Sequence, residues 1–287
     1  MNNISKKHHY LPVFYLKGFT NDSGRLKIYN VEKKIFVQNG KDFFPTSYFY
    51  EENSNTIFSE NGDSDFVESS YSDFDNETAK IITKINNSNY TENYNIHDGD
   101  MPRLNHFVSL IYWRLPHRKQ ELKNIVDNNE LINLGLSVQN SDGTINQKSS
   151  EKLKNHPEFL KSFKFFNSLA DSVRGIHCRT PYTIFNRHQE LPFICSDNPV
   201  IFEKDLPNVF EDDYIFPLSG TRIFVKSNRK EPFDYYLWLL VDVLIYKLAV
   251  KYVSCTHTEY IEMLENHFQK YNMTILEFKI EVFKRLK

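Results

Sequence analysis

The chain has 287 residues, of which 40% are hydrophobic and 25% are charged, and its formal net charge is −2. This composition is typical of a globular protein large enough to bury a core, and it excludes an intrinsically disordered chain. The small net charge excludes a global attraction to nucleic acid, so any such contact needs a local basic patch.

The cysteines and the hydrophobic pattern exclude several further classes. Cys178, Cys195 and Cys255 stand far apart and form no CxxC pair, which argues against a disulfide framework and a cysteine zinc site. The polar, basic start has no apolar run of the secretory kind. The most apolar stretch, residues 235–253, is interrupted by charges such as Asp242, so it predicts a buried helix rather than a membrane span. We expect a cytoplasmic protein without a membrane partner, in which Asp242 has a polar partner.

The N-terminal part begins with two adjacent histidines, His8 and His9, before a Tyr-Leu-Pro step and an aromatic-rich run. A strong turn signal at residues 21–24 is followed by short β-prone runs, which predict a hairpin over residues 26–37. The polar residues 51–72 predict a surface loop or a poorly ordered segment.

The middle of the chain has helical periodicity. Ser72 and Asp75 have the spacing of a capping box, which predicts a helix beginning there. Apolar residues recur at helical spacing over residues 104–115, where Pro116 ends the pattern, and again over residues 159–173.

The last hundred residues predict strands and then helices. Short β-prone runs bounded by turn residues fill positions 181–226, and the spacings Thr256-x-x-Glu259 and Thr274-x-x-Glu277 predict two capped helices. Hence we expect an α+β fold, a helical body with a small, mostly antiparallel β-sheet built from the N-terminal and 180–226 segments. We expect a single domain over residues 1–287, with an N-terminal His-His segment and hairpin (1–50), a helical middle (72–175), a β-rich segment (181–226) and C-terminal helices (234–287).

Several segments together resemble a bacterial family known as domain of unknown function 4238. The segments that carry the resemblance are HHYLPVFYLKGF (8–19), the hairpin 26–37, WRLPHR (113–118), FICSDNPV (193–200) and FPLS (216–219). The third is similar to an Arg-Thr-Pro step of the family, with Leu115 in place of threonine. The resemblance implies no activity, although the family's bacterial spread suggests a role in phage defence.

His8 and His9 are candidate catalytic residues. They can supply a general acid and a general base, or one of them a metal ligand. Neighbours in an extended backbone point to opposite faces, so only one of the two is expected to serve a given pocket. The alternative is that one caps a turn and the other is exposed.

Asp197 and Asn198 follow a β-prone run and precede Pro199, which favours an extended backbone at Asn198. Asp197 is a candidate base, ligand or histidine-orienting group, and Asn198 a candidate substrate contact. The alternative is an Asx-turn that ends the strand.

Arg114 and Arg118 are candidate contacts to an anionic substrate, because arginine at a core margin either pairs with a carboxylate or binds an anion such as phosphate. Glu77 lies at the edge of an apolar helix face, where it is a candidate catalytic carboxylate, a partner for Arg114, or part of a solvated face.

These residues suggest a hydrolase of the nuclease type that cleaves an anionic phosphodiester. Two other classes stay open: a non-catalytic module that binds a nucleotide, a nucleic acid or a protein, and a structural protein in which these groups form internal ion pairs. The sequence has no P-loop, GxGxxG, HExxH or EF-hand pattern, and it leaves both the cofactor and a metal requirement open.

Overall fold

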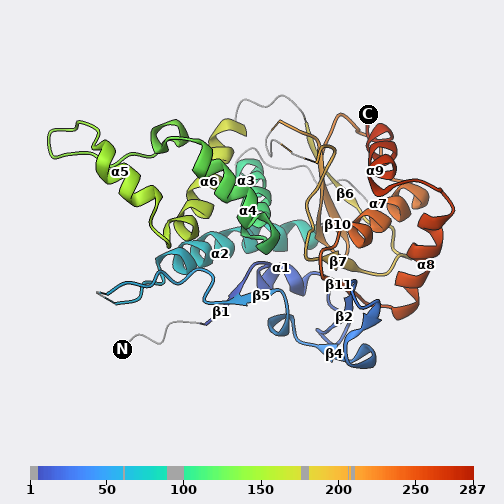
Figure 1. The fold of residues 1–287 in the computed structure, drawn as a ribbon. Coiled ribbons are helices and arrows are strands. Elements are labelled where there is room, and N and C mark those ends of the chain that lie inside the picture. Colours follow the sequence, from blue (N-terminus) through green and yellow to red (C-terminus); the bar gives the residue numbers. More distant parts are fainter. Residues whose placement is uncertain (1–5, 61, 89–99, 176–180, 206, 208–210) are drawn as a thin grey trace.

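The computed structural model describes residues 6–60, 62–88, 100–175, 181–205, 207 and 211–287. It confirms the predicted α+β fold, with a lobe of helices on one side and a lobe of sheets backed by helices on the other (Figure 1). In the described part of the chain, no helix is both long and apolar enough to cross a bilayer.

The N-terminal segment lies between the two lobes. Strand β1 (Lys7–His9) pairs antiparallel with β5 (Tyr50–Glu52) and forms a short ribbon. Helix α1 (Val13–Lys17) follows and buries Tyr15 and Leu16. The Tyr15 hydroxyl donates to the Pro217 carbonyl oxygen at 2.8 Å, so this segment is tied to a strand 200 residues further on.

Five helices and two 3₁₀ turns make up the helical lobe. They are α2 (Phe66–Asn86), α3 (Asp100–Arg114), η3 (Pro116–Arg118), α4 (Lys119–Asn128), η4 (Leu131–Leu134), α5 (Gln147–Lys154) and α6 (Phe159–Gly175). Helices α3 and α6 confirm the predicted helical patterns, and Pro116 begins the turn after α3. Helix α2 begins six residues before Ser72, so the predicted capping box is wrong, and the predicted loop ends at Asp65, the N-cap. Val67 and Tyr71 extend the apolar face of the helix and pull this first turn onto the core.

The strands of the second lobe form two sheets. Antiparallel strands in the order β6-β10-β9-β8 form the first, and β3-β2-β11-β7 form the second, in which β4 also pairs with β2. The bounds of the first sheet are β6 (Tyr182–Asn186), β8 (Ile201–Phe202), β9 (Tyr214–Ser219) and β10 (Arg222–Lys226); those of the second are β2 (Leu26–Asn30), β3 (Ile35–Phe36), β4 (Asp42–Phe43), β7 (Ile194–Ser196) and β11 (Tyr252–Cys255).

We predicted one sheet shared by the N-terminal and 180–226 segments. Of the strands in residues 180–226, only β7 lies in the same sheet as the N-terminal strands β2, β3 and β4. The sequence analysis placed Tyr252 and Val253, the first two residues of β11, in the apolar run 235–253. Helix α7 (Tyr235–Lys247) ends earlier, and β11 enters the sheet between β2 and β7. A short apolar run fits a strand as well as a helix until its neighbours are known.

The first sheet is buried on both faces. Tyr214, Phe216 and Phe224 pack into the core shared with α3, whereas Ile215 and Ile223 pack into a second core around α7. Helices α8 (Thr258–Gln269) and α9 (Ile275–Lys284) complete that second core.

The two predicted C-terminal caps differ in outcome. Thr274 and Glu277 form a complete capping box at the start of α9, as predicted. The prediction at Thr256 is wrong, because α8 begins after His257, whose side chain makes no capping hydrogen bond. The Thr256 hydroxyl instead accepts a hydrogen bond from the Phe193 backbone N–H at 3.2 Å.

The structure confirms that the apolar helix is buried and that Asp242 has a polar partner. Its side chain is fully buried and accepts a hydrogen bond from Arg187 Nη1 at 2.8 Å and another from the Tyr260 hydroxyl. Arg187 also donates to the Pro192 carbonyl oxygen at 2.8 Å. The carboxylate thus ties α7 to α8 and to Arg187, the residue that directly follows β6.

We expect Asp242→Ala to lower the free energy of unfolding by about 3–5 kcal/mol, because it leaves the Arg187 charge buried without its partner. Asp234→Ala is the matched control. Asp234 caps the same helix by accepting from the Leu237 backbone N–H, and its loss costs about 1 kcal/mol. Urea unfolding followed by circular dichroism measures both values, and equal losses would contradict a buried ion pair.

Candidate functional site

The β1–β5 ribbon separates the two histidines. His8 is paired in register with Glu51, and His9 with Tyr50. Partners in antiparallel strands share a face, so His8 and Glu51 point one way and His9 and Tyr50 the other. His8 is buried, whereas His9 is half-buried and its ring centroid lies 5.6 Å from that of Tyr50. Burial is the main cause that lowers the pKa of His9.

The protonation state of His8 follows from its backbone partner. The Asn55 backbone N–H donates to His8 Nδ1 at 2.9 Å. A backbone N–H can only donate, so Nδ1 carries no proton and the imidazole is neutral with its proton on Nε2. In this state His8 offers a hydrogen-bond donor to its surroundings. It is not a general base through Nε2, which differs from the acid–base role first considered.

Asn55 connects the ribbon to two helices. Its Nδ2 donates to Glu68 of α2 at 2.7 Å, and its Oδ1 accepts a hydrogen bond from Lys164 Nζ of α6 at 3.2 Å. Glu51, on the His8 face of the ribbon, also forms a 2.9 Å salt bridge with Lys119. Hydrogen bonds and an ion pair therefore join the ribbon to α2, α4 and α6.

Lys164 is a buried lysine, and burial lowers its pKa from its ordinary 10.5 to about 8. The positive charge of Lys119 lowers the pKa further, while the carboxylate of Glu51 raises it. A lysine with such a pKa can exchange a proton near neutral pH.

Arg114 lies at the C-terminal end of α3 and is 5% exposed. Its Nη1 donates to both carboxylate oxygens of Asp75, at 3.1 and 3.0 Å, and its guanidinium carbon lies 3.8 Å from the centre of the Tyr71 ring. Burial raises the pKa of Asp75, and the charge of Arg114 opposes this rise. The positive charge of Arg114 also helps to lower the pKa of Lys164. We call the group formed by these side chains the His8 cluster; its members are His8, Glu51, Asn55, Glu68, Tyr71, Asp75, Arg114 and Lys164.

Glu77 is not the partner of Arg114. It is exposed on α2 and forms a 2.6 Å salt bridge with Lys80. Residues two positions apart in a helix lie about 200° apart around its axis. Glu77 therefore points away from the face on which Asp75 pairs with Arg114. The structure therefore favours the solvated-face alternative for Glu77.

Arg118 forms a separate pair outside the His8 cluster. Its guanidinium lies 4.2 Å from the centre of the Tyr112 ring, and its Nη1 donates to Glu121 at 3.0 Å. This is the structural ion pair that the sequence analysis kept as an alternative to anion binding.

Asp197 is an anchor for the backbone. Its buried carboxylate accepts hydrogen bonds from three consecutive backbone N–H groups, those of Val250, Lys251 and Tyr252, at 2.8, 2.7 and 2.9 Å. Burial raises its pKa, and the three hydrogen bonds oppose this rise. Asn198 acts on the same turn, because its Nδ2 donates to the Leu248 carbonyl oxygen at 2.9 Å.

The candidate residues come from three segments that lie close together: the ribbon with His8, the end of α3 with Arg114, and the turn with Asp197. Only the first two segments contribute to the His8 cluster. Tyr10 lies between this cluster and Asp197: burial raises its pKa most, and the charges of Asp197 and Glu51 raise it further. Asp197 and Asn198 adjoin the cluster and use their side chains to hold the turn before β11.

Lys164 is a residue that sequence reasoning missed. It begins a buried polar stripe on α6 with Asn167, Ser168 and Asp171, at helical spacing. The sequence analysis considered only the apolar pattern of this helix, and Phe166, which belongs to that pattern, is 38% exposed. The regular spacing of the polar residues was the available signal.

The polar stripe of α6 packs along α3, which presents buried polar residues of its own. His106 Nε2 lies 3.4 Å from the Ser168 hydroxyl, and Asp171 accepts from the Trp113 indole N–H at 2.7 Å and from the Ser109 hydroxyl at 3.3 Å. Burial lowers the pKa of His106 to about 4, so this imidazole is neutral at physiological pH.

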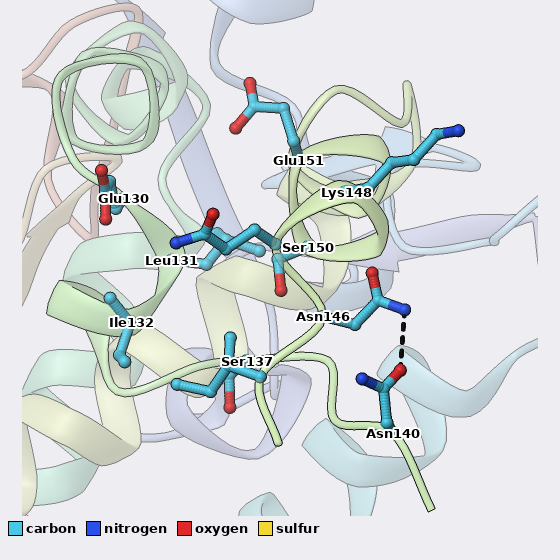
Figure 2. A pocket seen from close by; sticks show the side chains of 11 residues that line it. Glu130, Leu131, Ile132, Ser137, Asn140, Asn146, Lys148, Ser150 and Glu151 are labelled. Atoms are coloured by element: carbon cyan, nitrogen blue, oxygen red, sulfur yellow. Dashed lines mark hydrogen bonds between the residues drawn. The ribbon is translucent and has the colours of Figure 1, made fainter.

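A separate surface hollow of about 740 Å³ lies between η4 and α5 (Figure 2). Helix α5 lies at the outer end of the helical lobe, away from the ribbon (Figure 1). The polar groups of the hollow serve local structure: Asn146 caps α5 by accepting from the Ser149 backbone N–H and donates to Asn140, while Ser150 accepts from the Val138 backbone N–H. None of the predicted site residues lines it.

Among the described residues, no group of three or more His, Cys, Asp or Glu side chains could hold a metal ion. Cys195 and Cys255 are free and buried, with pKa values raised to about 12 by burial, and Cys178 lies outside the described residues.

Comparison with known proteins yields one match. Residues 7–278 match the model of the family described as "Protein of unknown function (DUF4238)", which confirms the resemblance found in the sequence. No curated protein matches the chain, and neither does any solved structure.

We expect Asp197→Asn to lower the free energy of unfolding by about 2–3 kcal/mol. The amide has one acceptor oxygen in place of two, so it leaves at least one buried backbone N–H without a partner. Asp142→Asn is the control, because Asp142 accepts a similar hydrogen bond from the Thr144 backbone N–H in an exposed turn, and its change stays within about 0.5 kcal/mol. Urea denaturation compares the two, and a similar small loss for both would show that Asp197 is no anchor.

We expect Lys164→Met to raise the free energy of unfolding at pH 7 by about 1–3 kcal/mol, since it removes a charge that is costly to bury. The native pKa of about 8 lies below the ordinary 10.5, so the unfolded chain binds more protons between these values and the wild type gains stability as pH rises. The advantage of the variant should therefore shrink between about pH 8 and 10. Chemical denaturation across this range measures it, and an advantage that grows with pH would disprove the lowered pKa.

Proposed function

Because the chain belongs to the DUF4238 family, whose description states no activity, we propose its function from the His8 cluster: a hydrolase of the nuclease type that cleaves an anionic phosphodiester. The observation that carries the proposal is the combination of a neutral His8, a buried Lys164 with a pKa of about 8, and the buried guanidinium of Arg114.

Two cations of the cluster suit an anionic substrate. Arg114 and Lys164 are cations in surroundings of low polarity, where attraction to a phosphate is stronger than in water. His8 accepts from the Asn55 backbone N–H through its Nδ1, and Asn55 in turn accepts from Lys164, so the histidine helps to position this cation. Together these groups stabilise the negative charge that develops on the phosphorus oxygens as water attacks.

The same cluster holds groups for proton transfer. In the proposed reaction a water molecule attacks phosphorus and gives its proton to Glu68, the half-buried carboxylate of the cluster. The bond from phosphorus to the leaving oxygen breaks, and Lys164 protonates that oxygen. A general acid is most effective when its pKa lies near the working pH, and Lys164 meets this condition.

The defence role and the cytoplasmic location expected from the sequence belong to this proposal as well. The alternative is a non-catalytic module in which the same charges bind a nucleotide, a nucleic acid or a protein. Turnover separates the two.

We expect the purified chain to hydrolyse single-stranded DNA, RNA or bis-p-nitrophenyl phosphate, and Lys164→Met to lower kcat by at least about 100-fold through loss of the general acid. Lys123→Met is the matched control, because Lys123 is an exposed lysine paired with Asp127 and should leave the rate unchanged. Assays with and without Mg²⁺ and EDTA also show whether a metal is needed.

Two results would contradict the proposal. Binding of these substrates without turnover supports the binding module, and equal rates for Lys164→Met and Lys123→Met place the chemistry elsewhere. Because Lys164→Met is expected to be the more stable protein, a loss of activity in it is not a loss of folding.

A further inference from the structure

Arg114 has a free edge on its guanidinium. Both contacts to Asp75 are made by Nη1 alone, while Nε and Nη2 are sealed from solvent and have no hydrogen-bond partner. In a guanidinium, Nε–H and one Nη2–H point in parallel from the same side of the planar group. Buried donors without partners are rare, because each costs about 1–3 kcal/mol of desolvation.

Tyr71 places its hydroxyl beside this edge, where it interacts with Arg114. Its ring lies under the guanidinium, and its hydroxyl is buried without a hydrogen bond of good geometry. Lys164 also lies close enough for the charge of Arg114 to lower its pKa. Two parallel N–H donors, a hydroxyl and a neighbouring ammonium match the oxygens of a tetrahedral oxyanion.

We propose that the Nε/Nη2 edge of Arg114 and the hydroxyl of Tyr71 form the seat of one phosphate group. This inference rests on the proposed function and deepens it, because it assigns the atoms that hold the phosphoryl group of the substrate. The parallel donors of arginine bind two oxygens of a phosphate at once, which a lysine cannot do.

Arg118 shows what distinguishes Arg114. It has the same arrangement, with a tyrosine ring under the guanidinium and a carboxylate on Nη1. However, its side chain is 19% exposed, and only its Nε is both buried and without a partner. At Arg114, by contrast, Nε and Nη2 are both buried, and neither has a hydrogen-bond partner of good geometry. Since that edge is closed to solvent, the ion enters through local opening, and association is slower than for an open site.

Inorganic phosphate is the probe, because it carries the recognised group and cannot be hydrolysed. We expect phosphate at about ten times its Kd to raise the Tm by about 3 °C over sodium chloride of equal ionic strength. Tyr71→Phe keeps the ring and removes the hydroxyl, so it should weaken phosphate binding by about 3- to 10-fold. Arg114→Lys keeps a charge and removes the parallel donors, and it should weaken binding at least about tenfold.

Arg103→Lys is the control and should bind phosphate as the wild type does, since Arg103 lies over the Phe74 ring on the same helix and outside the cluster. Should Arg114→Lys fail to fold, Tyr71→Phe still tests the seat. A phosphate effect no larger than that of chloride, or unchanged binding in Tyr71→Phe, overturns the inference. Phosphate binding without hydrolysis rejects the catalytic proposal alone, and hydrolysis with no binding at Arg114 rejects the seat alone.

Discussion

Asp197 holds together the part of the molecule on which both sheets depend. It stands in the turn between β7 and β8, which belong to different sheets, and its carboxylate fixes the backbone that enters β11. Strand β11 in turn joins β2 from the N-terminal segment to β7. One carboxylate therefore sets the positions of chain segments that lie more than 150 residues apart. A buried carboxylate needs such partners, since isolation in the core would cost several kcal/mol.

In the helical lobe, buried polar and charged side chains also need partners, and they find them on neighbouring helices. Helices α3 and α6 place polar stripes against each other, and α2 and the β1–β5 ribbon contribute further charges. Apolar residues in these positions would pack with less cost, because buried ion pairs are often no more stabilising than a hydrophobic core. The arrangement also leaves Phe166 exposed on the outside of α6. A fold that accepts both costs favours a functional reason for the buried charges, as active sites commonly sacrifice stability.

The protonation states of the His8 cluster follow from its neighbours. The Asn55 backbone N–H keeps His8 neutral, and burial among other cations brings the pKa of Lys164 close to neutrality. His9 has the same side chain as His8, yet the ribbon turns it to the opposite face and against Tyr50. Identical residues one position apart thus acquire different chemistry, because a strand alternates its faces.

Local pattern in the sequence was sufficient for the α+β class, the helices α3 and α6, the capped start of α9 and the burial of Asp242. These features depend on periodicity and on contacts within a few residues, which the order of residues records directly. The pairing of β11, the exclusion of Glu77, the anchoring role of Asp197 and the recruitment of Lys164, Asn55 and Glu68 depend on which distant segments meet. Only the tertiary structure decided these, because contacts between different segments leave no periodic spacing in the sequence, and because a polar helix face has the same sequence pattern whether water or another helix covers it.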